Sequence, residues 1–315
     1  MYKRNKKIIS CSIGVCVYNE EKNIKRFIDS LLKQKLKNVK IKEIIVIVSG
    51  STDKTLSIVK KFSKSNKLIK TIYKKKREGK AAAVNMFIEK ASKEILVLMG
   101  GDIILVPDTV QELVGKFSNN EVGMTGVRPI PINDIDSGLF GYAAHLLWEL
   151  HHRVSLQDPK MGEVVAFRKI FRKIPTISSV DEANIEPLIR GQGYKIVYVP
   201  EAKAYNKGPT NIRDFIKQRR RIFSGHLAVK YEQSYQVATM NILPIFKVLL
   251  SFLKENPKPK FILYTPLVIL IEMYSRFLGW WDYKAVNFSY STWETIKSTK
   301  DLSQAKLGAP DEKRS

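Results

Sequence analysis

Short apolar, β-branched runs alternate with amphipathic segments through the first hundred residues of the chain. The runs at residues 8–18, 41–48, 68–73 and 95–99 have the length and composition of buried strands. The segments between them, such as residues 21–34, carry apolar side chains at the helical period. Strands and helices that alternate in this way form a parallel sheet covered by helices on both faces. The sequence therefore predicts an α/β protein with a doubly wound, mostly parallel sheet.

Beyond residue 102 the pattern is less regular. We predict helices at 107–117, 138–152, 181–190 and 212–230, and strands at 122–127, 164–168 and 196–199. These elements would complete a catalytic domain at residues 1–230. An apolar helical, membrane-associated region follows at 231–285, and a polar, loosely held tail at 286–315.

The fourth predicted strand ends in a candidate cation ligand, Asp102. An acid at the carboxyl end of a strand lies where open α/β sheets bind their ligands. Gly100 and Gly101 precede it and add no side-chain bulk, so that a phosphate or metal can approach the backbone. A carboxylate is a ligand suited to Mg²⁺ or Mn²⁺. The alternative is an ordinary turn aspartate.

Two further loops carry polar side chains at the same predicted edge. Asn19 and Glu20 close the first strand, and Ser49 and Asp53 follow the second. Like Asp102, these side chains lie on loops that follow predicted strands. They could form turns and cap helices, and Asp53 is well placed to cap the next helix.

Seven short motifs occur in an order that resembles the family 2 glycosyltransferases, which have the nucleotide-sugar-binding GT-A fold. They are VYNEE, VSGSTD, GKAAAVN, GGD, DE, GYKIVYVP and QRRRI, and the resemblance covers about residues 8–230. The resemblance implies an inverting transfer of a sugar from a nucleotide-diphospho-sugar to a hydroxyl group of a glycan or lipid-linked acceptor. It also implies a divalent cation, Mg²⁺ or Mn²⁺, which would stabilise the leaving diphosphate.

The resemblance also implies roles for individual residues. Asp102 would hold the metal, and His226 is a candidate for a further metal ligand. Glu182 aligns with the family's catalytic aspartate and Asp181 with the acid before it; this order is reversed here, which leaves open which one is the base. The donor would contact side chains from loops and from the basic helix (Asn19, Glu20, Ser49, Asp53, Lys80, Gln218, Arg219 and Arg221).

Simpler roles exist for several of these residues. Lys80 could be a solvated helix lysine, and Asp181 could be a helix N-cap. The arginines at 219–221 could lie on a solvated basic face, and at least one of them is expected to do so.

Three positions depart from the family pattern. Gly100 replaces the first aspartate of the family's DAD, and Ser49 replaces the second aspartate of its DDG. The second change leaves specificity for uridine open. Ile222 replaces the tryptophan of the family's QxxRW, which argues against processive polysaccharide synthesis.

The chain is strongly basic, with a formal net charge of +24. Such a charge favours anionic partners: phosphorylated substrates, an anionic membrane surface or nucleic acid. We expect no nucleic acid, because aromatic side chains are not interleaved with the basic ones. A basic nucleic-acid-binding protein and a catalytically degenerate nucleotide-sugar-binding protein are the alternative functions. A sugar-phosphate nucleotidyltransferase is disfavoured because VYNEEKN lacks the glycine-rich loop of that class.

Two apolar stretches, 237–253 and 261–281, follow the predicted domain. Lys258 and Lys260 lie between them, and Trp280 and Trp281 close the second, as in helices that lie in a membrane interface. The second stretch is long enough to span a bilayer, but it contains Glu272. We therefore expect attachment at the cytoplasmic face of the cell membrane; an ordinary helical subdomain or dimer contact is the alternative.

Overall fold

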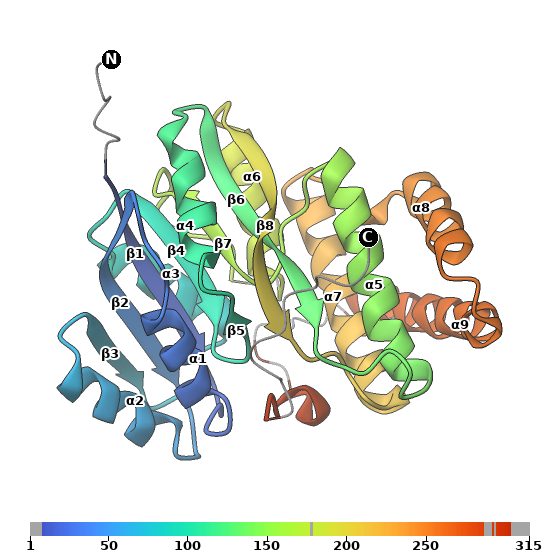
Figure 1. Cartoon of the computed structure of the whole chain (residues 1–315), viewed down its shortest axis with the longest axis horizontal. Helices are drawn as coiled ribbons and strands as arrows, with labels where there is room; N and C mark the ends of the chain where they lie inside the picture. The colour runs from blue at the N-terminus through green and yellow to red at the C-terminus, as the bar shows by residue number, and fades with distance from the viewer. Residues whose placement is uncertain (1–7, 177–178, 287–291, 293, 304–315) are drawn as a thin grey trace.

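The computed structural model describes residues 8–176, 179–286, 292 and 294–303. A mixed eight-stranded sheet forms its centre, in the order β3-β2-β1-β4-β7-β6-β8-β5 (Figure 1). The strands are β1 (Ile9–Val17), β2 (Val39–Ser49), β3 (Ile69–Lys74), β4 (Ile95–Gly100), β5 (Ile104–Leu105), β6 (Val122–Pro131), β7 (Val165–Arg168) and β8 (Lys195–Asn206).

The first half of the sheet has the predicted parallel pairing. β1 lies between β2 and β4, and β3 extends the parallel ladder beyond β2. In the second half β6 and β8 are parallel, whereas β7 is antiparallel to both β4 and β6. The two-residue strand β5 was not predicted; it pairs antiparallel with β8 at the edge. The prediction of a doubly wound, mostly parallel sheet with flanking helices is confirmed.

Helices cover both faces of the sheet, and the sheet separates two apolar layers. One layer contains side chains of α1 (Ile24–Leu32), α2 (Thr55–Ser65) and α4 (Thr109–Gly115). The other contains those of α3 (Lys80–Lys90) and α6 (Asp181–Arg190).

Alternation along β1 sends its side chains into both layers. Cys11 faces the first layer and Cys16 the second, and both are free thiols. Between them, Gly14 lets α3 approach closely, because a Cβ there would lie 2.3 Å from Phe87 Cγ.

The remaining long helices form a second body of the molecule, at the right in Figure 1. They are α5 (Leu139–Gln157), α7 (Ile212–Glu232), α8 (Ile242–Glu255) and α9 (Pro259–Trp281). Tyr142 of α5, Phe215 of α7, Phe252 of α8 and Phe261 of α9 share one apolar cluster. The apolar region beyond residue 230 therefore packs directly against the predicted catalytic domain.

Two details at the C-terminal end differ from the prediction. The first apolar stretch is helical only from Ile242, because residues 238–240 form a separate turn of 3-10 helix. In the predicted loose tail, Ile296 and Leu302 are buried, so this part is packed. The tail residues 287–291, 293 and 304–315 lie outside the described residues.

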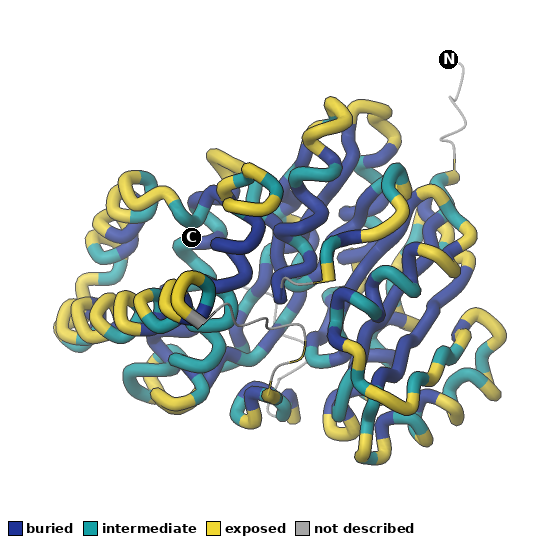
Figure 2. The backbone as a smooth tube through the Cα atoms, turned by 180° about the vertical axis from the view of Figure 1, so that it is seen from behind, coloured by how far each residue is buried: buried dark blue, intermediate teal, exposed yellow. Residues whose placement is uncertain are grey.

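The outer side of α9 is exposed over most of its length (Figure 2). Within the described part of the chain, Pro259–Ala285 is the one segment long and apolar enough to cross a membrane. The other apolar stretch, 237–253, contributes to α8, which has 14 residues and is too short to span a bilayer.

Candidate active site

One cavity of about 750 Å³ opens at the carboxyl ends of β1, β2 and β4. Its volume is within the range of about 300–1,000 Å³ that small-molecule sites have. It extends from the strand ends, past the start of α6 and along α7, into the space between α5, α8 and α9. Most of the predicted site residues line it: Glu20, Ser49, Lys80, Asp102, Glu182, Gln218, Arg219, Arg221 and His226.

Asp102 and Glu20 lie at the sheet end of the cavity and share a lysine. Lys300 Nζ is 3.0 Å from Asp102 Oδ2 and also contacts Glu20 Oε1. Burial raises the pKa of Glu20 to about 8, and the charge of Asp102 adds to this effect. Burial would also raise the pKa of Asp102, but the adjacent Lys300 ammonium lowers it below its usual value. Asp102 is therefore an anion with a cationic partner already in place.

Asn19 and Asp53 do not line the cavity; they tie two loops together. Asn19 adopts a positive φ of 52°, and its Oδ1 accepts a hydrogen bond from the Thr52 amide at 2.8 Å. Asp53 accepts from the Glu21 and Thr55 amides, at 3.0 and 2.9 Å. The turn-and-cap alternative thus describes both residues, whereas Ser49 lines the cavity wall. Asn19 and Asp53 therefore position the loops that carry Glu20 and Ser49.

Lys80 connects α3 to the two acids that begin α6. Its Nζ is 2.7 Å from Asp181 Oδ2 and 3.6 Å from Glu182 Oε1. Gly79 precedes it with a φ of 90°, which a residue with a side chain rarely adopts. Lys80 is therefore not a solvated helix lysine.

The two acids differ in what they face. The Asp181 side chain is 1% exposed, whereas that of Glu182 is 16% exposed and lines the cavity. Burial raises the pKa of Asp181 against the opposing charge of Lys80. Burial also acts on Glu182, but the Lys80 charge and a backbone hydrogen bond lower its pKa below the usual value. Glu182 is thus the ionised carboxylate that a bound molecule can reach.

The three arginines of α7 have three different partners. Arg219 donates two hydrogen bonds to Glu272 of α9, at 2.7 and 2.8 Å. Arg220 pairs with Asp282, and Arg221 donates to the Ser179 carbonyl at 3.1 Å. Arg219 and Arg221 line the cavity, as does Gln218. We expected at least one of the three arginines to lie on a solvated basic face. Each of them instead has a partner, and Arg220 is held by the buried carboxylate of Asp282.

His226 is buried in the cavity wall, away from the sheet end. Burial lowers the pKa of His226 well below its usual value, and the charges of Lys160, Arg219 and Arg276 lower it further. Neighbouring cations also disfavour a bound metal ion. In the residues that the structure describes, no three His, Cys, Asp or Glu side chains gather as a metal site. The structure thus gives His226 no support as a metal ligand.

The sequence pattern did not indicate several charged residues of the cavity, among them Lys160, Glu163 and Lys300. Glu163 has a positive φ of 59°, a strained backbone typical of functional sites, and Asn206 Nδ2 donates to its carboxylate at 2.9 Å. Burial and then the charge of Asp102 raise the pKa of Glu163 to about 7. Gly162-Glu163 beside a predicted strand was the one available signal. Lys300 gave none, because it lies in a polar segment.

Comparison with known proteins supports the resemblance to the family 2 glycosyltransferases. An uncharacterized glycosyltransferase of Haemophilus influenzae is 36% identical over 110 residues, which cover 35% of this chain and 33% of that protein. The poly-beta-1,6-N-acetyl-D-glucosamine synthase of Staphylococcus aureus is 23% identical over 242 residues, covering 73% of this chain and 57% of that protein. The chain thus spans less than two thirds of the length of either relative.

The fold is shared with a solved mannosyltransferase from Pyrobaculum calidifontis, in complex with GDP-Man and Mn²⁺. The two structures have a TM-score of 0.61 at 19% sequence identity, over 86% of this chain and 87% of that one. The GT-A prediction is therefore confirmed. The family model of glycosyl transferase family 2 matches residues 12–175, just over half of the chain. The chain belongs to glycosyl transferase family 2.

Proposed function

We propose that the protein is an inverting, metal-dependent glycosyltransferase that moves a sugar from a nucleotide-diphospho-sugar to a hydroxyl acceptor. The observation that carries this proposal is the arrangement of charges in one cavity. The anionic Asp102 lies at the sheet end, and the ionised Glu182 faces the same space from the start of α6. The cations Lys80 and Arg221 also line it. A site of this kind can hold a diphosphate and a proton acceptor together.

The donor class fits the wall at the strand ends. Tyr18 and Ser49 line the cavity there, and the guanidinium of Arg77 lies 3.9 Å from the centre of the Tyr18 ring. We place the nucleoside against these residues and the diphosphate toward Arg221 and the Asp102 cation site. The mannosyltransferase of the same fold binds GDP-Man, and we extend the donor class, not the sugar, to this chain.

Transfer with inversion follows from a single displacement. The acceptor oxygen attacks the anomeric carbon, its proton passes to the Glu182 carboxylate, and the bond to the nucleotide diphosphate breaks with both electrons on the phosphate oxygen. Arg221 lies close enough to both acids for its charge to act on their pKa values. It can therefore stabilise the developing phosphate charge near the reacting atoms. Asp181, enclosed and paired with Lys80, holds that lysine in place.

The residues at the sheet end fit a divalent cation that takes most of its ligands from the donor. Mg²⁺ is commonly bound through one or two carboxylates plus substrate phosphates, and Asp102 supplies one such carboxylate. The ammonium of Lys300 beside Asp102 supports a cation at this position. When bound, a metal would neutralise charge on the leaving diphosphate. The acceptor is a hydroxyl of a glycan or of a lipid-linked molecule.

A thermal-shift screen with GDP and UDP, each with and without Mn²⁺, tests donor binding. A ligand at 100 times its Kd stabilises the native state by about 2.7 kcal/mol, which is readily measured. Turnover is then followed as release of the nucleoside diphosphate from the matching donor. Binding without any turnover would favour the catalytically degenerate alternative. No stabilisation by any nucleotide would contradict the proposal.

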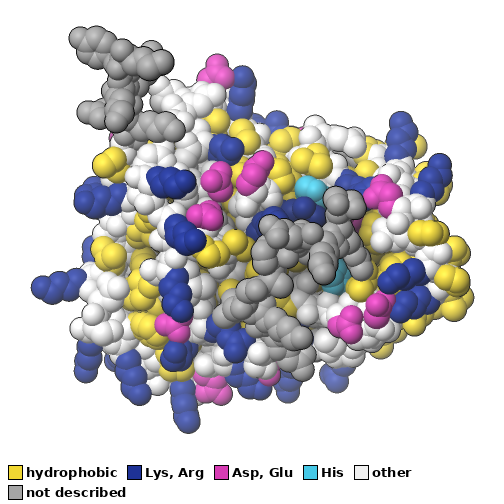
Figure 3. Space-filling model, viewed as in Figure 1, with side chains coloured by type: hydrophobic (Ala, Val, Ile, Leu, Met, Phe, Trp, Pro, Cys, Tyr) yellow, Lys and Arg dark blue, Asp and Glu magenta, His cyan; other side chains and the backbone are white. Residues whose placement is uncertain are grey.

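We further propose that the protein works at an anionic membrane surface, with the cytoplasmic face of the cell membrane as its location. Lys and Arg side chains are spread over the face shown in Figure 3, with hydrophobic ones among them at the right-hand edge. On α9, Lys260 pairs with Asp136 near one end, and exposed Trp280 and Trp281 close the other. Co-sedimentation with anionic vesicles but not with neutral ones is expected. Recovery of the expressed protein in the soluble fraction at low and high salt, without detergent, would refute this location.

A further inference from the structure

The cavity has a second part that the donor and the reacting groups do not use. Between α5, α8 and α9 most of the side chains that line it are apolar, and we call the part lined by these apolar side chains the apolar branch. It is lined by Leu146 and Leu150 of α5, Ile245 and Leu249 of α8, and Val268 and Ile269 of α9. Since these residues line the same cavity as Glu182, a molecule lying in the branch can present one end to the proposed base.

We propose that the apolar branch binds the hydrocarbon chain of an amphiphilic acceptor, so that the acceptor is a long-chain lipid whose polar, anionic head also carries the accepting hydroxyl group. This inference rests on the proposed function and selects between its two acceptor classes. A glycan in the branch would bury hydroxyl groups against aliphatic walls without hydrogen-bond partners, which is unfavourable. A hydrocarbon chain there leaves water for an apolar surface, which is favourable.

The branch opens where a lipid chain can enter. Ile242 of α8 and Met273 of α9 line the cavity and are also strongly exposed, so they mark its mouth. Further exposed apolar side chains lie on the same two helices, among them Leu243, Phe246 and Phe277. Contiguous exposed apolar surface of this kind marks a binding or membrane-contact site.

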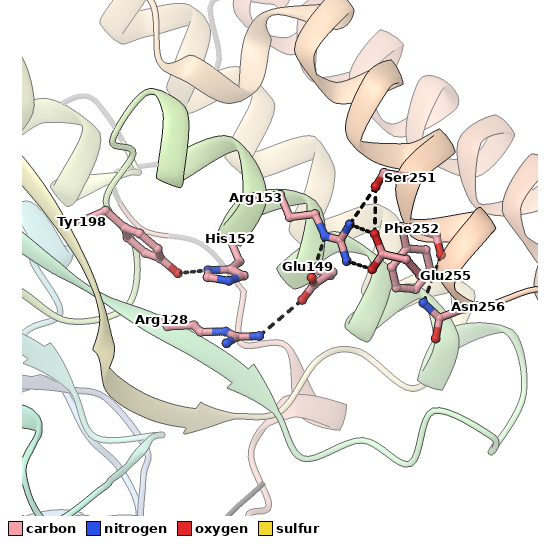
Figure 4. Close-up of polar contacts among 9 residues, drawn as sticks. All are labelled: Arg128, Glu149, His152, Arg153, Tyr198, Ser251, Phe252, Glu255 and Asn256. Atoms are coloured by element: carbon pink, nitrogen blue, oxygen red, sulfur yellow. Dashed lines mark hydrogen bonds and ion pairs between the residues drawn. The ribbon is translucent and has the colours of Figure 1, made fainter. Parts of the chain in front are cut away.

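Polar contacts outside the branch fix the position of α8, which forms one of its walls, relative to α5. In Figure 4, Arg153 of α5 donates to Glu149 on its own helix at 2.7 Å and to Glu255 Oε1 at the end of α8 at 2.6 Å. It also donates to Ser251 of α8 at 3.2 Å. Glu149 in turn accepts from Arg128 of β6 at 3.4 Å. α8 is thus tied to α5 and the sheet through its polar side, while Ile245 and Leu249 face the cavity.

Polar groups are present where the branch meets the rest of the cavity. His151 is 5% exposed, and neither of its ring nitrogens has a hydrogen-bond partner among the described residues. A buried polar side chain normally has a partner, so a ligand is the natural one here. Neutral imidazole offers one donor and one acceptor, which suits the head of the lipid.

The charges nearby favour an anion. Glu272 accepts from both Arg219 and Arg276, at 2.7 and 2.8 Å, and this group of three side chains keeps one net positive charge. All three line the cavity, as does Lys160. A phosphate is the anionic lipid head that such a group binds well.

A chain-length series tests the assignment. Hexyl, octyl and decyl phosphate, each below its micelle concentration, are titrated into the full-length protein by calorimetry. Burial of one methylene corresponds to about a fourfold gain in affinity, so each step of two carbons should tighten binding by about fifteenfold. The matching n-alkyl alcohols should bind more weakly. Equal affinity for all chain lengths would overturn the chain site, and equal affinity for the alcohols would overturn the anionic head.

Two adjacent positions of α9 give a matched pair of variants. Ile269→Glu places a charge in the branch, whereas Leu270→Glu places it on the outer surface; these side chains are 39% and 62% exposed, so both variants are expected to fold. Ile269→Glu should abolish the chain-length dependence, and Leu270→Glu should keep it. The same loss in both variants would contradict the proposal. His151→Leu should weaken binding of decyl phosphate about fivefold, which corresponds to one hydrogen bond, and unchanged binding would remove His151 from the head site.

Nucleotide binding separates failure of this inference from failure of the proposed function. If GDP or UDP stabilises the protein and alkyl phosphates show no chain-length dependence, the inference alone is wrong. If the chain-length dependence is found and no nucleotide binds, the proposed transferase activity is wrong, and the branch remains a lipid site.

Discussion

Glu182→Gln and Asp181→Asn should separate turnover from stability, although the two acids are adjacent in sequence. Each change keeps the shape of the side chain and removes its charge. Glu182 faces the cavity as an ionised carboxylate, so the glutamine cannot accept the proton of the acceptor. Loss of a general base lowers kcat by about 10²–10⁴, or about 3–5 kcal/mol in the barrier. The Tm should change little, because Glu182 is the more distant partner of Lys80, at 3.6 Å.

Asp181→Asn should instead affect stability. Asp181 is almost fully buried and pairs with Lys80 at 2.7 Å. Removing one partner of a buried ion pair typically costs about 3–5 kcal/mol. We expect the lower end, about 3 kcal/mol, since Glu182 still partners the lysine. Its kcat, measured below the new Tm, should fall much less than that of Glu182→Gln.

Steady-state kinetics with the donor identified by thermal shift, and calorimetric unfolding of both variants, check these expectations. Nucleotide affinity serves as the control and should be retained in Glu182→Gln. If Asp181→Asn loses turnover at unchanged Tm while Glu182→Gln remains active, the assignment from exposure is wrong and Asp181 is the base.

Three further predictions concern the sheet end of the cavity. Asp102→Asn should abolish the Mn²⁺-dependent part of nucleotide stabilisation, and unchanged Mn²⁺ dependence in a thermal-shift titration would contradict a metal role for Asp102. Lys300→Met should tighten the apparent Mn²⁺ affinity about tenfold, because displacing one charged hydrogen bond costs about 1.5 kcal/mol; calorimetry with weaker Mn²⁺ binding would refute this competition. Glu163→Gln should flatten the pH dependence of stability: since the folded pKa of about 7 exceeds the unfolded one, the wild type loses this contribution as pH rises from about 4.5 through 7. Chemical denaturation at several pH values measures the last effect, and parallel curves for both proteins would exclude it.

The sequence alone predicted the sheet and the position of the site. Strand character depends on local composition, and β1, β2 and β4 end where the polar loops begin. Glu20, Ser49 and Asp102 therefore meet at one edge, because parallel strands place their carboxyl ends together. The roles of individual loop residues were harder to predict. Asn19 and Asp53 are polar loop residues, as ligand-binding residues often are, but their side-chain oxygens accept hydrogen bonds from backbone amides instead.

Only the tertiary structure decided how the chemistry is divided within the site. Asp181 and Glu182 are adjacent acids on one helix, and their difference arises because α6 turns one toward Lys80 of α3 and leaves the other facing the cavity. Lys300 reaches Asp102 across 198 positions of sequence, a contact that no local pattern encodes. The apolar branch likewise exists only because α5, α8 and α9 pack with a space between them. An apolar stretch in sequence predicts burial of a helix face, but whether that face meets another helix, a membrane or a ligand depends on long-range packing.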